Sequence, residues 1–199
     1  GPDATAITFI YDNGVAGDAA SDSTNWVFEF DDIEQVASCP SNDALITDFE
    51  DDPASYDFGI DGGFGGGAAS VINNPQVDGN NGSAQVGEML KFAGEVFGGS
   101  TLALTTPVDV PPKSVFTMKV WAQREVPVLF KLEGGPVGEV QVTHGGTGWE
   151  TLNFDFGDVS GNGVTGITLI FDLGVAGDAA GDPGNWTFYF DDIAIGGGG

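Results

Sequence analysis

The chain has 199 residues, of which 30 are acidic and 5 are basic, so its formal net charge is −25. A chain this acidic does not bind nucleic acid by neutralising phosphates, which excludes that class of partner. Hydrophobic residues make up 41% of the sequence, enough for a packed core, and no apolar run is long enough to span a membrane.

A long internal repeat is the first element in chain order. Ile7–Ile33 reappears as Ile167–Ile193 at an offset of 160 residues, and 19 of the 27 positions are identical. A repeat of this period indicates a tandem array of domain-sized units. The predicted division is the C-terminal strand pair of a preceding unit at 1–37, a linker at 38–44, a complete unit at 45–196 and a glycine tail at 197–199.

The complete unit alternates apolar and polar residues with period two between Gly, Asn, Asp and Pro turns, which is typical of β-strands. Within 114–123, for example, Phe116, Met118 and Val120 share one face. Only 88–95 also fits a short helix. The predicted strands are 45–49, 68–72, 84–86, 89–92, 100–104, 114–123, 128–133, 139–143, 149–156, 166–171 and 185–193. Such two-faced strands predict an all-β fold, a two-sheet antiparallel β-sandwich.

The two copies of the last strand differ on one face only. The retained pairs are Trp26/Trp186, Phe28/Phe188 and Phe30/Phe190, and the varied pairs are Val27/Thr187 and Glu29/Tyr189. Side chains of a strand point alternately to its two faces. The retained face, including both Trp residues, is therefore predicted to pack in the core, and the varied face to meet solvent or ligand.

An ordered set of segments carries a family resemblance. DFEDDPASYDFG, SAQVGEM, FTMKVWAQ, GWETLNFDF and FYFDDI follow one another within 45–195. In this order they resemble the jelly-roll carbohydrate-binding modules of the xylan- and β-glucan-binding groups, which are attached to polysaccharide-degrading enzymes. The insertion GVAGDAAGDPGN departs from that pattern. With it, the module looks like a marine-bacterial subtype that is repeated in secreted proteins. The resemblance implies a jelly roll, a polysaccharide partner and a secreted or cell-surface location.

The resemblance also implies a structural calcium ion between the first and last strands, which are neighbours in that family. Carried over, it places Ca²⁺ between Glu50 and Asp192, with Asp48 or Asp191 as further ligands. Carboxylate oxygens are suitable ligands for this ion. The alternative is two exposed acidic strand ends, each solvated by water.

A weaker metal site is predicted in the loop 172–185. Its acidic residues Asp172, Asp178 and Asp182 recur in the earlier copy as Asp12, Asp18 and Asp22. Their spacing lacks the regular pattern of a helix-flanked calcium loop. The alternative is a turn-rich loop in which Asp accepts hydrogen bonds from its own backbone.

One outward sheet face is predicted to bind sugar, because aromatic rings stack on pyranose rings while polar side chains bond the hydroxyls. The predicted binding residues are Trp121, Lys119, Gln123, Arg124, Lys131, Gln141 and Asn153. Trp149 and Tyr189 are weaker candidates. The cations suit an anionic glycan, but Lys also bonds neutral sugars. The alternative for Trp121 is a contact that covers the sandwich.

Catalysis has little support, since the sole histidine, His144, has no nucleophile motif near it and no phosphate loop occurs. The predicted function is therefore a non-catalytic carbohydrate-binding module. By resemblance alone, a β-glucan such as laminarin is the first expected ligand, and alginate or another acidic algal glycan is the second. A structural repeat of a calcium-stabilised bacterial adhesin, surface layer or extracellular filament fits the repeat and the acidity equally well.

The repeat tail itself predicts an interaction. Ile7–Ile33 reads as a two-strand hairpin with an apolar face that needs cover. We expect it to add strands to the jelly roll of a neighbouring copy, by donation or exchange. The alternative is that it packs on its own chain as an extra layer.

Overall fold

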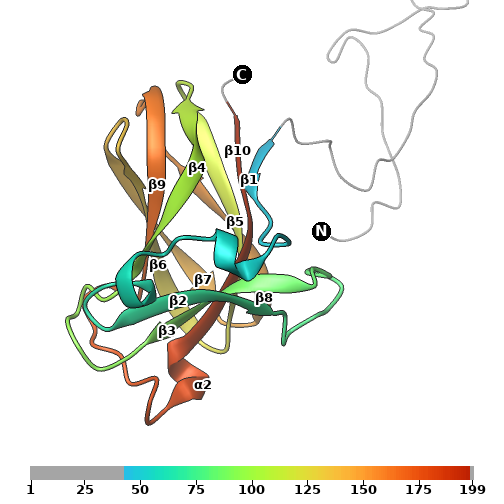
Figure 1. The fold of residues 1–199 in the computed structure, drawn as a ribbon, viewed down its shortest axis with the longest axis vertical. Helices are drawn as coiled ribbons and strands as arrows, with labels where there is room; N and C mark the ends of the chain where they lie inside the picture. The colour runs from blue at the N-terminus through green and yellow to red at the C-terminus, as the bar shows by residue number, and fades with distance from the viewer. Residues whose placement is uncertain (1–42, 198–199) are drawn as a thin grey trace, which may run out of the picture. The chain divides into compact units, whose positions relative to one another are not determined.

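The computed structural model describes residues 43–197. The predictions for the tail at Ile7–Ile33, strand exchange among them, lie outside the described residues, as does most of the predicted linker. The strands are β1 (Ala44–Thr47), β2 (Gly67–Asn73), β3 (Gln85–Lys91), β4 (Ser100–Val110), β5 (Ser114–Ala122), β6 (Glu125–Glu133), β7 (Gly138–Gly145), β8 (Gly148–Asp155), β9 (Gly161–Phe171) and β10 (Thr187–Gly197) (Figure 1). Three short helices join them, η1 (Pro53–Ser55), η2 (Ile60–Gly62) and α2 (Pro183–Trp186).

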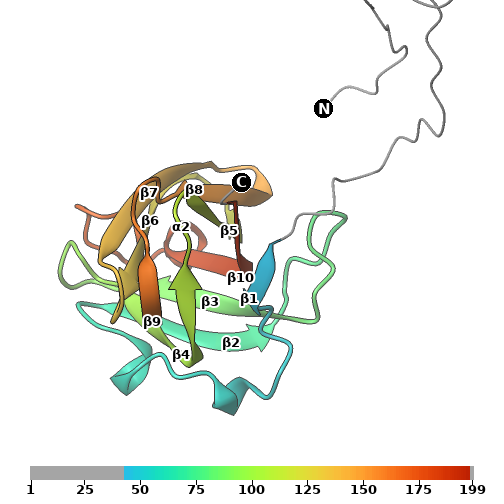
Figure 2. The ribbon, with the colours of Figure 1, turned by 90° about the horizontal axis from the view of Figure 1, so that it is seen from above.

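These strands form two antiparallel sheets packed face to face, which confirms the predicted all-β sandwich. Sheet A has the order β2-β3-β10-β5-β8, with β1 as a sixth strand beside β10, and sheet B has the order β4-β9-β6-β7. Figure 2 shows the two layers from above. The chain crosses from sheet A to sheet B between β5 and β6, so these two consecutive strands lie in different layers.

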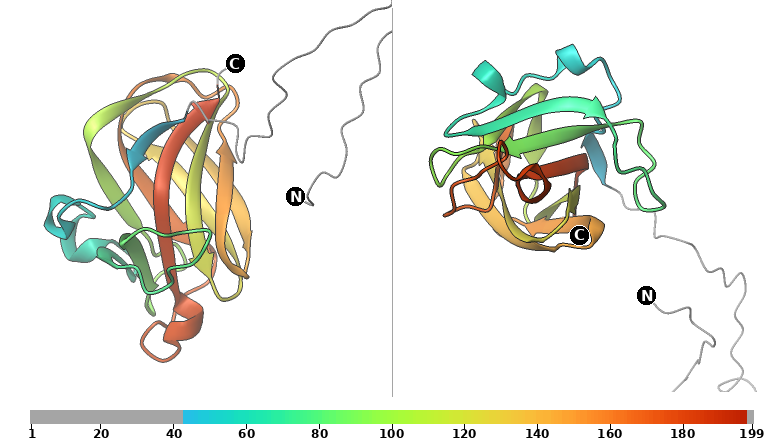
Figure 3. Two further views of the ribbon diagram at one scale, coloured as in Figure 1. Left: turned by 90° about the vertical axis from the view of Figure 1, so that its right-hand side faces the viewer. Right: turned by 90° about the horizontal axis from the view of Figure 1, so that it is seen from below.

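Strand β10 runs along sheet A, with β1 beside its C-terminal half (Figure 3). Its first half, Thr187–Phe190, pairs with β3 instead. Between the two halves the register with β5 shifts after Asp191, and Asp192 has a left-handed backbone conformation with φ of 47°. A bulge of this kind bends a strand and redirects its side chains. Because of this bulge, the successive carboxylates of Asp191 and Asp192 both have partners on the same side of the sheet.

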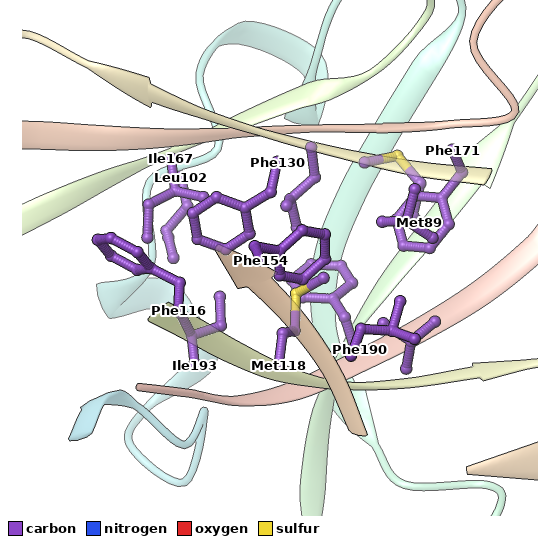
Figure 4. Close-up of a cluster of buried hydrophobic side chains, with 14 of the residues drawn as sticks. Met89, Leu102, Phe116, Met118, Phe130, Phe154, Ile167, Phe171, Phe190 and Ile193 are labelled. Atoms are coloured by element: carbon purple, nitrogen blue, oxygen red, sulfur yellow. The ribbon is translucent and has the colours of Figure 1, made fainter. Parts of the chain in front are cut away.

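Phenylalanine rings fill the space between the sheets (Figure 4). The ring centroid of Phe130 lies 5.3 Å from that of Phe116 and 4.9 Å from that of Phe154, and none of the three is exposed. Burying each such side chain contributes roughly 1.5–3 kcal/mol. The predicted inward face of β5 is confirmed, because Phe116, Met118 and Val120 are all fully buried.

Several element boundaries differ from the prediction. Strands β4 and β9, for example, are longer than the predicted 100–104 and 166–171. The segments predicted as separate strands, 84–86 and 89–92, form the single strand β3, with no helix. Gly87 lies inside this strand because a Cβ at that position would overlap the ring of Phe190. The start of the strand predicted at 185–193 is helix α2 instead, which has Pro183 in its first turn.

Candidate functional site

The predicted binding residues do not share one face. Lys119 and Trp121 on β5 and Asn153 on β8 belong to sheet A, whereas Lys131 on β6 and Gln141 on β7 belong to sheet B. The prediction of a single face is therefore wrong. Alternation along a strand tells which residues point outward, but it does not tell which of the two sheets the strand joins.

Three aromatic side chains form a row across the outer face of sheet A. Tyr189 on β10 is directly opposite Trp121 on β5, which is directly opposite Trp149 on β8. The rings of Trp121 and Tyr189 lie 5.2 Å apart between centroids, tilted by 43°. Trp149 is only 6% exposed, but Trp121 and Tyr189 are half-buried and present ring surface to solvent. We call these three residues the aromatic row.

A loop, residues 74–84 between β2 and β3, covers one side of the aromatic row. The carbonyl oxygen of Gln76 accepts a 2.7 Å hydrogen bond from Nε1 of Trp149, which holds that indole in place. Asn81, with no exposed surface, donates a 2.8 Å hydrogen bond to the carboxylate of Asp191. The sequence signals only a turn here, since the loop is rich in Asn, Gly and Asp. Its cover over sheet A was not predicted.

The charged groups beside the row are paired or buried. Nζ of Lys119 lies 2.7 Å from Oδ2 of Asp192. Burial raises the pKa of Asp191 to about 6, although the hydrogen bond from Asn81 opposes this effect. Burial also raises the pKa of Glu88, which is opposite Tyr189 on β3. The row thus has the carboxylate of Glu88 at its β3 end and those of Asp191 and Asp192 beside Tyr189 along β10.

A small cavity opens where the loop meets the row. Its volume is about 180 Å³, and it is lined by Asn80, Lys119, Trp149, Glu150 and Thr151. Thr151 is directly opposite Lys119, next to the pair formed by Trp121 and Trp149. The cavity therefore extends the row with polar groups.

Arg124, predicted to bind ligand, is engaged by the protein itself. Its Nη2 lies 2.7 Å from Oδ2 of Asp172, its Nε donates a 3.0 Å hydrogen bond to the carbonyl oxygen of Asn185, and its guanidinium lies 4.7 Å from the ring centroid of Trp186. It thereby joins both ends of the loop 172–185, which contains the insertion. Trp186, predicted as core, packs against the core but stays half-buried.

Lys91 is a second cation that holds this insertion, and no sequence signal pointed to it. Its ammonium is buried and donates hydrogen bonds of 2.6 Å and 2.8 Å to the carbonyl oxygens of Phe171 and Asp172. Burial lowers the pKa of Lys91 to about 8, against an opposing effect of the Asp172 charge. Gln123, in the turn after β5, is exposed.

The outer face of sheet B carries a polar network. Lys131 pairs with Glu133 at 2.7 Å, and the Thr168 hydroxyl donates a 2.9 Å hydrogen bond to the same carboxylate. Burial alone would raise the pKa of Glu133, but these two hydrogen bonds and the positive charge of Lys131 together outweigh it and lower the pKa. Gln141 lies on the neighbouring strand and is exposed. The four strands of this sheet present no outward aromatic ring, which makes it a poorer surface for stacking.

The four residues of the main predicted calcium site have other partners. Asp48 accepts a 3.2 Å hydrogen bond from the backbone of Glu50, and Glu50 accepts one of 3.1 Å from the backbone of Gln85. Asp191 bonds Asn81 and Asp192 pairs with Lys119, as described above. Within residues 43–197 no group of three or more His, Cys, Asp or Glu side chains is arranged to hold a metal. The side chains do not fit a calcium site in this arrangement, and calcium stays a prediction from the sequence.

The insertion shows the turn chemistry given as the alternative to a second metal site. Asp178 accepts a 3.2 Å hydrogen bond from the backbone of Gly181, and Asp182 accepts one of 2.7 Å from the side chain of Asn185. Asp172 is paired with Arg124. Asp178 and Asp182 thus bind groups of their own loop, whereas the partner of Asp172 lies outside it.

His144 is part of the core. It has no exposed surface, and its Nε2 lies 3.1 Å and 2.8 Å from the carbonyl oxygens of Val120 and Gly148. Nδ1 accepts a 2.9 Å hydrogen bond from the backbone of Gly146, so the neutral ring carries its proton on Nε2. A buried imidazole with both nitrogens occupied is not placed to contact a substrate.

A second, larger cavity lies away from the aromatic row, between β1 and β4. Its volume is about 510 Å³. Leu45, Ile46, Leu102, Leu104 and Val108 form its apolar part, and hydroxyl and carboxylate side chains line the remainder. The ladder between β4 and β9 is interrupted between Ala103 and Val108, which leaves this edge of the sandwich open.

No family model matches the chain, and no curated protein matches it either. Solved structures do. A variant of the family 29 carbohydrate-binding module CBM29-2 is 16% identical with a TM-score of 0.45, covering 80% of this chain and 94% of that one. The CBM22-2 xylan-binding domain of a Paenibacillus barcinonensis xylanase is 11% identical with a TM-score of 0.48, covering 75% and 96%.

A third similar structure belongs to a larger protein. The CBM22-1 and GH10 modules of a Clostridium thermocellum xylanase, complexed with xylohexaose, are 11% identical with a TM-score of 0.49. The match covers 77% of this chain but 29% of that one. At such identities and TM-scores these proteins are similar in fold, and no ligand follows from them.

None of the helices in the described part of the chain is long and apolar enough to cross a membrane.

Proposed function

We propose that residues 43–197 form a non-catalytic carbohydrate-binding module of a secreted multimodular protein. The polysaccharide lies across the outer face of sheet A. The observation that carries the proposal is the aromatic row, in which Trp121 and Tyr189 are in register on adjacent strands and both are partly exposed. Aromatic rings stack on the apolar faces of sugar rings, and the polar groups beside them bond the hydroxyls.

The groups beside the row suit binding rather than bond cleavage. Asp192 is held in an ion pair with Lys119, and Asp191 is buried under Asn81. General acid–base catalysis needs a carboxyl group within reach of the proton it transfers. Glu88 on β3 and Glu150, which lines the cavity on β8, are separated by strands β10 and β5, about 14 Å, which is farther apart than the roughly 5–9.5 Å of a glycosidase pair. The site therefore offers recognition without a catalytic pair.

The experiment is a binding panel read by affinity electrophoresis and calorimetry. Its ligands are laminarin, xylan, mannan, galactan and alginate, with laminarin as the first choice because of the resemblance to β-glucan-binding modules. Trp121→Ala and Tyr189→Ala test sheet A, while Lys131→Ala and Gln141→Ala are matched controls on sheet B. We expect loss of binding in the first pair only. Loss in the second pair only would move the site to sheet B.

A structural role is the second candidate, and the repeat of Ile7–Ile33 as Ile167–Ile193 favours it. In this alternative the unit is one of many in an adhesin, surface layer or extracellular filament, and calcium stiffens it. Repeated units also raise the avidity of a binding protein, so the repeat fits both functions. If the unmodified protein binds none of the glycans in the panel, the result favours the structural role.

A further inference from the structure

We infer, resting on the proposed function, that the aromatic row ends in a polar subsite made by Asn80, Lys119 and Thr151, and that this site accepts neutral glycans and rejects carboxylated ones. The cavity of about 180 Å³ lies there, bordered by Trp149. An amide and a hydroxyl both donate and accept hydrogen bonds, and an ammonium donates. This is the mixture that sugar hydroxyls need.

The position of the subsite follows from the strand register. Lys119 is two residues from Trp121 on β5, on the same outer face, and Thr151 is directly opposite Lys119 on β8. A sugar ring stacked on Trp121 therefore has one edge directed along β5 toward these two side chains. Asn80 lines the cavity from the covering loop.

The loop that carries Asn80 is held firmly on both sides of that residue. Asp78 accepts hydrogen bonds of 2.7 Å and 3.0 Å from the backbone N–H groups of Asn80 and Asn81. Asn81 is anchored to Asp191, and Gln76 to Trp149. A wall fixed in this way loses little conformational entropy when ligand binds, so its contacts contribute fully to affinity.

The charges around the row exclude an acidic sugar. The sequence has five basic residues, and of these only Lys119 borders the row, where Asp192 already neutralises it. Arg124 pairs with Asp172, Lys131 pairs with Glu133 on sheet B, Lys91 is buried, and Lys113 precedes β5 at the end distant from Trp121.

A uronate would thus meet no unpaired cation at this site. It would face the carboxylate of Glu150, which lines the cavity, and that of Asp192, in a chain of net charge −25. Like charges placed together across an interface suppress binding. Laminarin-type glycans fit these charges and alginate does not, which decides between the two ligands expected from the sequence.

The test compares laminarin, xylan and mannan, each with its own carboxymethylated derivative, by calorimetry at constant ionic strength. We expect each neutral form that binds to bind at least ten times more tightly than its derivative. Asp192→Asn leaves Lys119 unpaired, and Asn tolerates the left-handed backbone at this position. It should raise affinity for the carboxymethylated form several-fold, with the melting temperature as a check on folding.

Asn80→Ala tests the subsite, with Asn162→Ala, an exposed residue on sheet B, as the matched control. We expect Asn80→Ala to bind the neutral glycan five- to tenfold more weakly. The control Asn162→Ala should bind it with unchanged affinity. Equal affinity for neutral and carboxymethylated forms, or full binding by Asn80→Ala while Trp121→Ala has lost it, overturns this inference alone. Absence of glycan binding, or full binding by Trp121→Ala, overturns the proposed function and the inference with it.

Discussion

Asp191 is covered by Asn81, whose side-chain nitrogen donates a 2.8 Å hydrogen bond to its carboxylate, and neither residue has exposed surface. The contact joins residues 110 positions apart in the chain. It fastens the covering loop to the centre of sheet A, beside the aromatic row.

The stability of the unit should respond to the titration of Asp191. Its pKa is raised from 3.8 to about 6 in the folded state, chiefly by burial. The folded state thus binds this proton more tightly, so its contribution to stability is complete below about pH 3.8 and is lost as the pH rises through about 6. Two pKa units correspond to roughly 2–3 kcal/mol.

Asp191→Asn should remove this loss. The free energy of unfolding of both proteins is measured in urea at pH 4 and pH 7.5. The quantity compared is the value for the variant minus that for the unmodified protein. We expect the difference to increase with pH by roughly 2 kcal/mol. Asp158→Asn, at an exposed position, is the control and should show a constant difference. A constant difference for Asp191→Asn as well would contradict the role given to its burial.

Lys91→Met should loosen the insertion. The carbonyl oxygens of Phe171 and Asp172 would lose the ammonium that donates to them. Buried acceptors without a partner cost about 1–3 kcal/mol each, so we expect a melting temperature several degrees lower and faster hydrogen exchange within 172–185. Lys113→Met changes the same side chain at an exposed position and should have little effect. Unchanged exchange in Lys91→Met would show that other contacts hold the insertion.

The inward and outward faces of the strands were predictable from the sequence, and their assignment to sheets was not. Phe116 and its neighbours on β5 alternate with polar residues in a short local pattern. Whether Lys131 lies beside Lys119 depends on where the chain crosses between layers, which is a property of the whole topology. The burial of Lys91 likewise depends on carbonyl groups about 80 residues away, and no local pattern records such a contact.

Calcium should leave the melting temperature nearly unchanged, in contrast to the expectation from the sequence. Glu50 and Asp192 are each bonded to another group of the protein, so binding a metal would first break those contacts. Scanning calorimetry in millimolar calcium and in excess chelator gives the melting temperature with and without the ion. A clear rise with calcium that Glu50→Gln abolishes would show that the calcium site forms after all.

The most direct test of the account is the affinity of Trp121→Ala for laminarin oligosaccharides, measured by calorimetry beside the unmodified protein and Lys131→Ala. The ring of Trp121 is the centre of the aromatic row, so its loss should weaken binding by about 2 kcal/mol or more, which is roughly thirtyfold or more, while Lys131→Ala binds normally. The melting temperature of Trp121→Ala should fall little, because the ring is only half-buried. Full affinity in Trp121→Ala, with loss in Lys131→Ala, would contradict the placement of the glycan on sheet A.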